Sequence, residues 1–242
     1  MTPHRVVLWG TGNVGRHAIA GIDARPDLEL VGVWVSSPDK VGRDAGELAG
    51  LGRRLGVAAT GERDEVRALA PDCVVHTAMA DHRLGEALDD LAMLLGAGIN
   101  VVSSGPVFLQ YPTGVVPDEM VAPVRDAALS GGVSLLVNGI DPGFANDALA
   151  LAVTGISERI EEVRCLEILN YATYDQPMVL FDIMGFGRPL DEVPMLLQPG
   201  VLTMAWGSVV RQLAAGLDVE LDAVEEFYER VEAPEDFAVD SG

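Results

Sequence analysis

The chain has 242 residues, of which 49% are hydrophobic, so it can bury the core of one large domain or two small ones. Its formal net charge of -21 repels phosphate backbones and anionic lipid heads, and we therefore expect neither nucleic acid nor a membrane as a partner. No stretch has the pattern of a secretory signal, and the two isolated cysteines, Cys73 and Cys165, lie in apolar runs. We expect reduced core thiols and a cytoplasmic protein.

The first predicted strand, residues 5–9, runs directly into the sequence Gly-Thr-Gly-Asn-Val-Gly at residues 10–15. In such a turn Gly10 permits the tight bend, Gly12 lets a phosphate approach the backbone, and Gly15 lets the next helix pack closely on the strand. The helix expected up to about Asp23 presents its N-terminus to that anion. The turn therefore predicts a dinucleotide cofactor site.

Strand and helix patterns then alternate up to about residue 138, which is typical of a doubly wound parallel sheet. The predicted strands are 5–9, 29–35, 56–59, 72–76, 99–102 and 133–137. A helix is expected from Asp81, as its N-cap, to about Gly96, because its leucines recur on one face. Another is expected to begin at Pro142, capped by Asp141, and to end at Gly155.

The pattern changes from Arg159 onward. Residues 159–171 predict one long strand with apolar side chains on both faces, followed by an irregular loop. A helical stretch at 178–184 and an apolar helix over 202–216 precede an acidic end. The predicted fold is therefore α/β, with a Rossmann-type dinucleotide-binding domain over 1–140 and an α+β lobe with a mixed sheet over 141–242, for substrate and dimerisation.

Cofactors of such a sheet bind beyond the carboxyl ends of the strands. The second strand ends at Ser36 and Ser37, where an NAD-selective fold usually carries a carboxylate for the ribose 2'-hydroxyl. With no acid to repel a 2'-phosphate, and with Lys40 and Arg43 nearby, we expect NADP(H) to be preferred, while NAD(H) stays open. The alternative is that these basic residues only solvate a surface loop. The candidate cofactor residues are Gly10, Thr11, Gly12, Asn13, Val14, Gly15, Arg16, Ser36, Ser37, Lys40, Thr77, Ala78, Ser103, Ser104 and Asn138.

Other chemistries find little support in the sequence. The four histidines have no metal-ligand spacing, so we expect no metal, and the Gly-x-Ser-x-Gly motif of hydrolases is absent. Hydride transfer needs mainly orientation and a matched electrostatic environment from the protein. A dehydrogenase is therefore compatible with a chain that lacks a pronounced catalytic motif.

Three segments carry a family resemblance: residues 7–16 around the glycine turn, 100–104, and 138–144 with the sequence Asn-Gly-Ile-Asp-Pro-Gly-Phe. They resemble the dihydrodipicolinate reductase-like superfamily and, with residues 167–171 and 198–200, its branch of native amine dehydrogenases and 2,4-diaminopentanoate dehydrogenase. The resemblance implies a Rossmann lobe with a mixed-sheet lobe and a homodimer. It also implies NAD(P)-dependent interconversion of a small-molecule amine with a ketone or aldehyde and ammonia.

The chain departs from that branch in two ways. Members place a glutamate after the fifth strand, where it activates ammonia, whereas residues 104–107 here are Ser-Gly-Pro-Val. The acid/base group is therefore unassigned, with Tyr174, Asn170 and Asn138 as candidates. Members also continue past the equivalent of residue 242, so part of the substrate pocket is expected outside this chain. The paired histidines of true dihydrodipicolinate reductases are absent, which argues against that activity.

For the substrate pocket we expect an apolar wall with a few polar groups that orient the substrate. The candidate residues are Phe144, Asn170, Tyr174, Met178 and Trp206. The alternative interpretation of Met178 and Trp206 is that they pack in a hydrophobic core and have no role in binding. Two other functions stay open: an NAD(P)-dependent reductase of another imine or carbonyl, and an NAD(P)-binding module without catalysis.

Overall fold

The structure is a computed structural model that describes residues 2–80, 83–236 and 238–239. The chain divides into two compact units, Met1–Pro112 with Val116–Gly139, and Thr113–Val115 with Ile140–Gly242. No helix within the described residues is long and apolar enough to cross a membrane.

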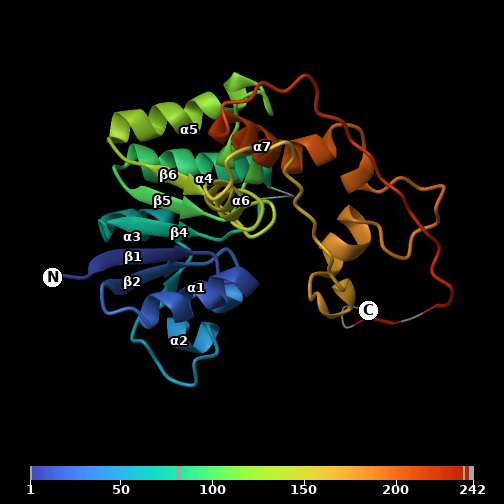
Figure 1. Ribbon diagram of the computed structural model, residues 1–242. Coiled ribbons are helices and arrows are strands. Elements are labelled where there is room, and N and C mark those ends of the chain that lie inside the picture. The colour runs from blue at the N-terminus through green and yellow to red at the C-terminus, as the bar shows by residue number, and fades with distance from the viewer. Residues whose placement is uncertain (1, 81–82, 237, 240–242) are drawn as a thin grey trace. The chain divides into compact units, whose positions relative to one another are not determined.

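The first unit is built on a six-stranded parallel sheet with the strand order β3-β2-β1-β4-β5-β6 (Figure 1). The order reverses between β1 and β4, so the glycine turn after β1 lies at the switch point where such sheets bind ligands. The expected strands are confirmed, except that the third is short and starts later, where it pairs with the end of β2. Their bounds are β1 His4–Trp9, β2 Leu28–Trp34, β3 Ala59–Thr60, β4 Cys73–His76, β5 Asn100–Ser103 and β6 Leu135–Val137.

Helices connect these strands and cover both faces of the sheet (Figure 1). The first begins where expected, directly after the glycine turn, and the cap expected at Asp81 lies outside the described residues. The helices of this unit are α1 Asn13–Asp23, α2 Ala45–Leu48, α3 Arg63–Ala68, α4 Leu84–Gly96 and α5 Asp118–Gly131, with one-turn 3-10 helices η1 Pro38–Lys40 and η2 Val107–Gln110.

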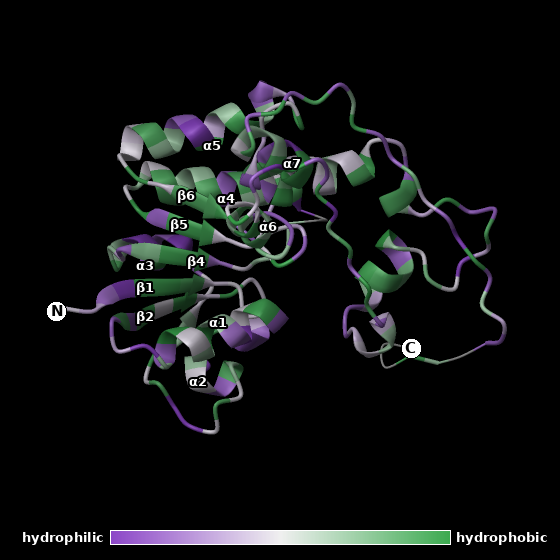
Figure 2. Cartoon of the chain, viewed as in Figure 1, coloured by the Kyte–Doolittle hydropathy of each residue, from purple (hydrophilic) through white to green (hydrophobic). Residues whose placement is uncertain are grey.

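Strand β1 is buried on both faces because alternate side chains enter two different cores. Val7 and Trp9 pack in the core that includes Leu91 of α4. Leu8 packs instead with Ile19 of α1. Figure 2 shows the matching hydrophobic colouring along the strands between the helices. This double burial holds the end of β1, and with it the glycine turn, in a fixed position.

The second unit contains helices and no named strand in its described residues. Its expected helices over 178–184 and 202–216 are present. The elements are α6 Ala148–Thr154, η3 Tyr171–Thr173, η4 Met178–Ile183, η5 Met195–Leu197 and α7 Val201–Gly216, of which η4 is a turn of π-helix.

The helix expected from Pro142 begins instead at Ala148, so that prediction is wrong. Asp147, not Asp141, is the N-cap, and its carboxylate accepts the backbone N–H of Ala148. Asp141 precedes a cis peptide bond to Pro142 in a turn. Its side chain is engaged elsewhere, as described below.

The prediction of a strand over residues 159–171 is wrong, and the described residues of the second unit contain no sheet. A strand needs a partner for its backbone N–H and C=O groups. The backbone of residues 159–171 forms no ladder with any other part of the described chain. Leu166 and Ile168 are exposed as a consequence. Cys165, expected in a core, is likewise exposed, whereas Cys73 is half-buried in β4.

Candidate cofactor and substrate sites

At two glycines of the turn, neighbouring backbone atoms leave no room for a side chain. Gly10 has a φ of +100°, and a Cβ built on it would lie 2.8 Å from the backbone nitrogen of Ala78. A Cβ on Gly15 would lie 2.0 Å from the carbonyl oxygen of Gly10. On Gly12, by contrast, a Cβ would have none of the described atoms within 4 Å. The turn therefore leaves open space where a phosphate would approach the backbone.

The start of α1 adds the electrostatic part of a phosphate site. Its N-cap is Gly12, no side chain caps the helix, and its first turn contains no acidic residue. The positive end of the helix dipole is therefore not compensated by a carboxylate from its own first turn. An anionic ligand is the natural partner for such a helix end.

Two other predicted cofactor residues contact this turn from neighbouring strand ends. Thr77, just after β4, donates its hydroxyl to the carbonyl of Gly10 over 2.8 Å. Lys40, after β2, places its Nζ 3.3 Å from the carbonyl oxygen of Thr11. The end of β2 thus brings a cation to the glycine turn.

The other basic residues near β2 are engaged in local contacts. Arg43 pairs with Glu47 over 3.0 Å, and Arg16 donates to the side chain of Asn13 over 3.2 Å. Ser36 is exposed and Ser37 is half-buried. Of the basic side chains predicted from the sequence, Lys40 is therefore the one whose hydrogen bond links the segment after β2 to the glycine turn.

The carboxyl ends of β4, β5 and β6 are linked by hydrogen bonds. The amide of Ser104 donates to the carbonyl of His76, and the amide of Asn138 donates to the carbonyl of Ser103, each over 3.0 Å. The Ser103 hydroxyl lies 3.0 Å from Nδ1 of His76, and both side chains are buried. Ser103 therefore faces inward and supports the strand ends, while Ser104 remains half-buried.

Burial lowers the pKa of His76 to about 4, with the charge of Arg83 acting in the same direction. The imidazole is consequently neutral at neutral pH. Its ring stacks on Trp9, with the centroids 6.4 Å apart, as expected of a packed side chain.

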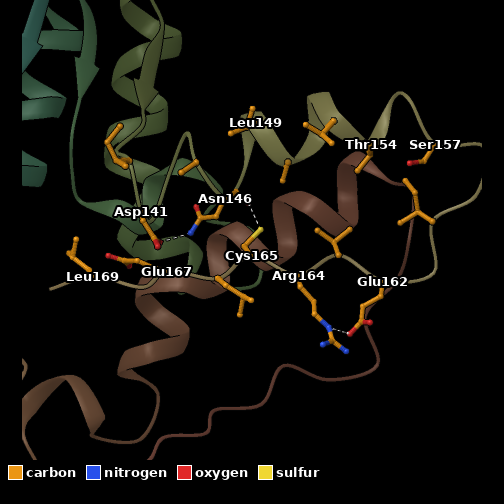
Figure 3. A pocket seen from close by; sticks show the side chains of 17 residues that line it. Asp141, Asn146, Leu149, Thr154, Ser157, Glu162, Arg164, Cys165, Glu167 and Leu169 are labelled. Carbon is orange, nitrogen blue, oxygen red and sulfur yellow. Dashed lines mark hydrogen bonds and ion pairs between the residues drawn. The ribbon is translucent and has the colours of Figure 1, made fainter.

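The second unit contains a pocket of about 710 Å³ between α6 and the extended segment that follows it (Figure 3). Most of its wall is apolar, and its charged groups lie toward opposite ends. The residues that line it are Ile140, Asp141, Ala145, Asn146, Leu149, Ala150, Val153, Thr154, Ser157, Ile160, Glu162, Val163, Arg164, Cys165, Leu166, Glu167 and Leu169.

Asp141 is held at one end of this pocket by two N–H donors. The indole Nε1 of Trp206 donates to Oδ1 of Asp141 over 2.7 Å, and the side-chain amide of Asn146 donates to the same oxygen over 2.5 Å. Glu167 lies beside Asp141 in Figure 3, and the Tyr171 hydroxyl is 3.5 Å from Oε1 of Glu167. A hydrogen bond to Asp141 raises the pKa of Glu167, and partial burial adds to that rise.

The substrate residues expected from the sequence lie outside this pocket's lining. Asn170 accepts the backbone N–H of Ala172 and caps η3, while Tyr174 packs edge-to-face on Tyr171 at 5.6 Å. Phe144 is exposed, and Met178 begins η4. The geometry thus gives Asn170 and Tyr174 local structural contacts.

Sequence reasoning missed the Asp141–Glu167 pair and the polar contact of Trp206. Asp141 looked like a helix cap, Glu167 lay within an expected strand, and Trp206 looked like an apolar wall. These residues are far apart in the chain, so no spacing rule connects them. Among the described residues, no group of three or more His, Cys, Asp or Glu side chains could hold a metal ion.

Comparisons with known proteins agree with this fold. Residues 4–102 match the family described as "Dihydrodipicolinate reductase, N-terminus". The chain is 45% identical over 224 residues to an amine dehydrogenase of Streptomyces virginiae, covering 93% of this chain and 62% of that protein. It is 26% identical over 206 residues to 2,4-diaminopentanoate dehydrogenase of Acetoanaerobium sticklandii, covering 82% of this chain and 55% of that protein.

A solved structure of amine dehydrogenase from Mycobacterium smegmatis has a similar fold, with a TM-score of 0.69 and 24% identity. The match covers 91% of this chain and 63% of that one. The chain thus spans roughly three fifths of the length of these proteins. The first part of the chain thus matches the N-terminal domain of dihydrodipicolinate reductase, and most of the chain is similar to amine dehydrogenase and 2,4-diaminopentanoate dehydrogenase.

Proposed function

We propose that this chain acts as an NAD(P)-dependent oxidoreductase that interconverts a small primary amine with a ketone or aldehyde and ammonia. The observation that carries the cofactor part is the turn that is closed at Gly10 and Gly15 and open at Gly12. The amine part is supported by the 45% identity to a protein named amine dehydrogenase. The chain spans 62% of that relative, and the activity of the whole protein is therefore part of the proposal.

In this proposal the nicotinamide supplies a hydride to the carbon of an imine and accepts it in the reverse direction. The protein would hold the pyrophosphate at the backbone of Gly12 and the start of α1. The net reaction joins a carbonyl compound, ammonium, a proton and NAD(P)H to give an alkylammonium ion, NAD(P)+ and water. The chain's own residues would bind the cofactor and the substrate, orient them and transfer protons.

A preference for NADP(H) over NAD(H) is the finer part of this proposal. Lys40 is bonded to the glycine turn, and Ser36 occupies the place where a carboxylate would repel a 2'-phosphate. We expect Lys40→Ala to weaken NADPH binding about tenfold and NADH binding much less. Ser36→Asp should reverse the preference. Fluorescence titration with both reduced cofactors measures this, and equal losses for both would contradict the assignment.

The direct test of the function is amine-dependent reduction of NADP+ at alkaline pH. A series of short aliphatic amines and diamines is screened as substrates, and the absorbance of NADPH measures the product. Gly12→Val is the matched control, because its side chain would occupy the phosphate approach and a Cβ at this position has none of the described atoms within 4 Å. We expect turnover in the parent chain and none in the variant. Absence of turnover with every amine, despite cofactor binding, would contradict the amine part.

A second candidate is a reductase of another imine or carbonyl compound. It is favoured by the turn after β5, where residues 104–110 contain no carboxylate that could handle ammonia. Introducing one by Pro106→Glu separates the two candidates. A gain of amine activity would support the amine dehydrogenase, and no gain together with carbonyl reduction would favour the second candidate.

Two further expectations belong with the function. A homodimer is implied by the family resemblance, and sedimentation equilibrium of the purified protein tests it. We also propose a cytoplasmic location, because Cys73 and Cys165 are free cysteines, and cell fractionation tests it.

A further inference from the structure

Asp141 and Glu167 form a carboxyl pair whose geometry is set by other side chains. Oδ1 of Asp141 receives N–H donors from Trp206 at 2.7 Å and Asn146 at 2.5 Å. Glu167 is positioned from the extended segment, with the Tyr171 hydroxyl 3.5 Å from its Oε1. Asp141 is half-buried and Glu167 is exposed toward the pocket that both residues line.

The pair stands at one end of a largely apolar pocket of about 710 Å³ (Figure 3). Leu149 and Val153 come from α6, and Val163 and Leu166 come from the extended segment on the other side. The far end holds the ion pair of Arg164 and Glu162, at 2.7 Å. An elongated ligand that fits this distribution carries a cation at one end and a hydrocarbon body.

We propose that Asp141 and Glu167 bind the nitrogen of an aliphatic primary amine, and that the apolar wall of this pocket receives its hydrocarbon chain. This inference rests on the proposed function. Two carboxyl groups offer an ammonium ion short, charge-assisted hydrogen bonds. Asp141 follows the end of β6 by four positions in the chain.

The pair also provides the proton that reductive amination requires. In that direction the intermediate is a carbinolamine, whose carbon bears both a hydroxyl and an amino group. Glu167 gives its proton to the hydroxyl oxygen, the C–O bond breaks with its electron pair on oxygen, and water leaves. The nitrogen lone pair forms the C=N bond. The resulting iminium cation faces the Glu167 carboxylate just formed and Asp141, which stabilise its charge.

A pH dependence distinguishes this role from mere structural support. The raised pKa of Glu167, caused first by its hydrogen bond to Asp141 and then by burial, means that an incoming ammonium must displace a proton at lower pH. Amine affinity should therefore rise as pH increases through that pKa, while the amine itself stays protonated. The other charged groups on this pocket, Glu162 and Arg164, are paired with each other. The Tyr171 hydroxyl also contacts Glu167, and burial raises the pKa of that phenol from its already alkaline ordinary value.

The test is calorimetric binding of propylamine, hexylamine and hexanol to the full chain and its Glu167→Gln variant, between about pH 5 and pH 8. We expect Glu167→Gln to weaken hexylamine binding about tenfold and to abolish its pH dependence. Glu161→Gln is the matched control, because Glu161 is an exposed carboxylate on the same segment that pairs with Arg159 and does not line the pocket. It should bind as the parent does.

A second variant tests the apolar wall independently of the carboxyl pair. Leu149 is 47% exposed, so Leu149→Trp can be accommodated by the fold while it fills the pocket. We expect it to reduce hexylamine binding and to leave propylamine binding nearly unchanged. Equal effects on both amines would contradict the placement of the hydrocarbon chain.

The outcomes separate this inference from the proposed function. Amine binding that depends on Glu167 without any reduction of NADP+ would leave the amine site standing and overturn the proposed oxidoreductase. Turnover with equal amine affinity in the parent and Glu167→Gln would overturn the site and leave the function standing. No binding of any alkylamine by the parent chain would also overturn the site. Binding of hexanol as tightly as hexylamine would overturn the role of the carboxyl pair.

Discussion

The indole of Trp206, on α7, donates its Nε1–H to Oδ1 of Asp141 over 2.7 Å, and this bond joins two residues that are 65 positions apart. Asp141 thereby becomes a fixed acceptor at the end of a pocket instead of the cap of a helix. Trp206 acts here through the polar edge of its indole. The fixed position of Asp141 and the polar role of Trp206 both follow from this hydrogen bond.

Removing this bond should destabilise the second unit. Trp206→Phe keeps an aromatic ring and deletes the donor. Because a hydrogen bond to a charged group contributes more than one to a neutral group, a double-mutant cycle with Asp141→Asn should give a coupling of about 1 kcal/mol. Urea unfolding followed by circular dichroism measures it. A coupling of zero would mean that the two side chains do not interact in solution.

The three glycines of the turn should respond differently to substitution. Gly15→Ala places a Cβ 2.0 Å from the carbonyl oxygen of Gly10 and should cost about 3 kcal/mol of folding free energy. A Cβ on Gly12 would have none of the described atoms within 4 Å, so Gly12→Val should leave the melting temperature nearly unchanged. It should still weaken cofactor binding about a hundredfold, since the side chain occupies the phosphate approach.

Thermal unfolding and NADPH titration of both variants check this prediction. A stable Gly15→Ala protein would show that α1 can move away from the turn. Full cofactor affinity in Gly12→Val would place the pyrophosphate elsewhere.

His76 should make the protein sensitive to acid. Its pKa in the folded protein is lowered to about 4 from 6.5, so the stabilisation is complete above pH 6.5 and is lost as the pH falls toward 4. That difference corresponds to about 3 kcal/mol of folding free energy. His76→Gln removes the titration and should lose less stability between neutral pH and pH 4.5. Urea unfolding at the two pH values measures the difference, and identical losses in both proteins would refute the assignment.

The buried carboxylate of Asp90 should depend on its two arginine partners unequally. Arg83, with 14% of its side chain exposed, lies 3.3 Å from Asp90, and Arg63, with 44% exposed, lies 2.8 Å away. Arg83→Ala should destabilise the protein by about 3 kcal/mol because it leaves a buried charge underpaired. Arg63→Ala should cost about 1 kcal/mol, since its exposed guanidinium is screened by water. Equal losses in urea unfolding would contradict this ranking.

The parallel sheet and the glycine turn could be predicted because local patterns report them. Runs such as residues 6–9 are apolar at every position when both faces of a strand are buried, and this part of β1 is buried in that way. Gly10 and Gly15 occupy positions where any side chain would meet backbone, so their spacing carries structural information directly. The helix of residues 201–216 could likewise be predicted from its apolar composition.

The errors arose where a local pattern fits two structures. Asp141 before a proline fits a helix cap, yet its carboxylate accepts from Asn146 and Trp206, and Asp147 caps α6 instead. Residues 159–171 have a strand-like composition, but a ladder needs a second segment to receive its hydrogen bonds. The local sequence indicates a propensity for strand conformation, but it does not show whether a second strand lies beside it.

By itself, the sequence determined the order of the strands and helices in the first unit and the place of the candidate phosphate site, because burial on both faces and glycine stereochemistry act within a few residues. The tertiary structure decided which charged groups meet. It brought Lys40, rather than Arg43, to the glycine turn, and it brought Glu167 to Asp141. The physical reason is that hydrogen bonds and ion pairs depend on distances of about 3 Å between atoms, which side chains far apart in the chain reach only after folding.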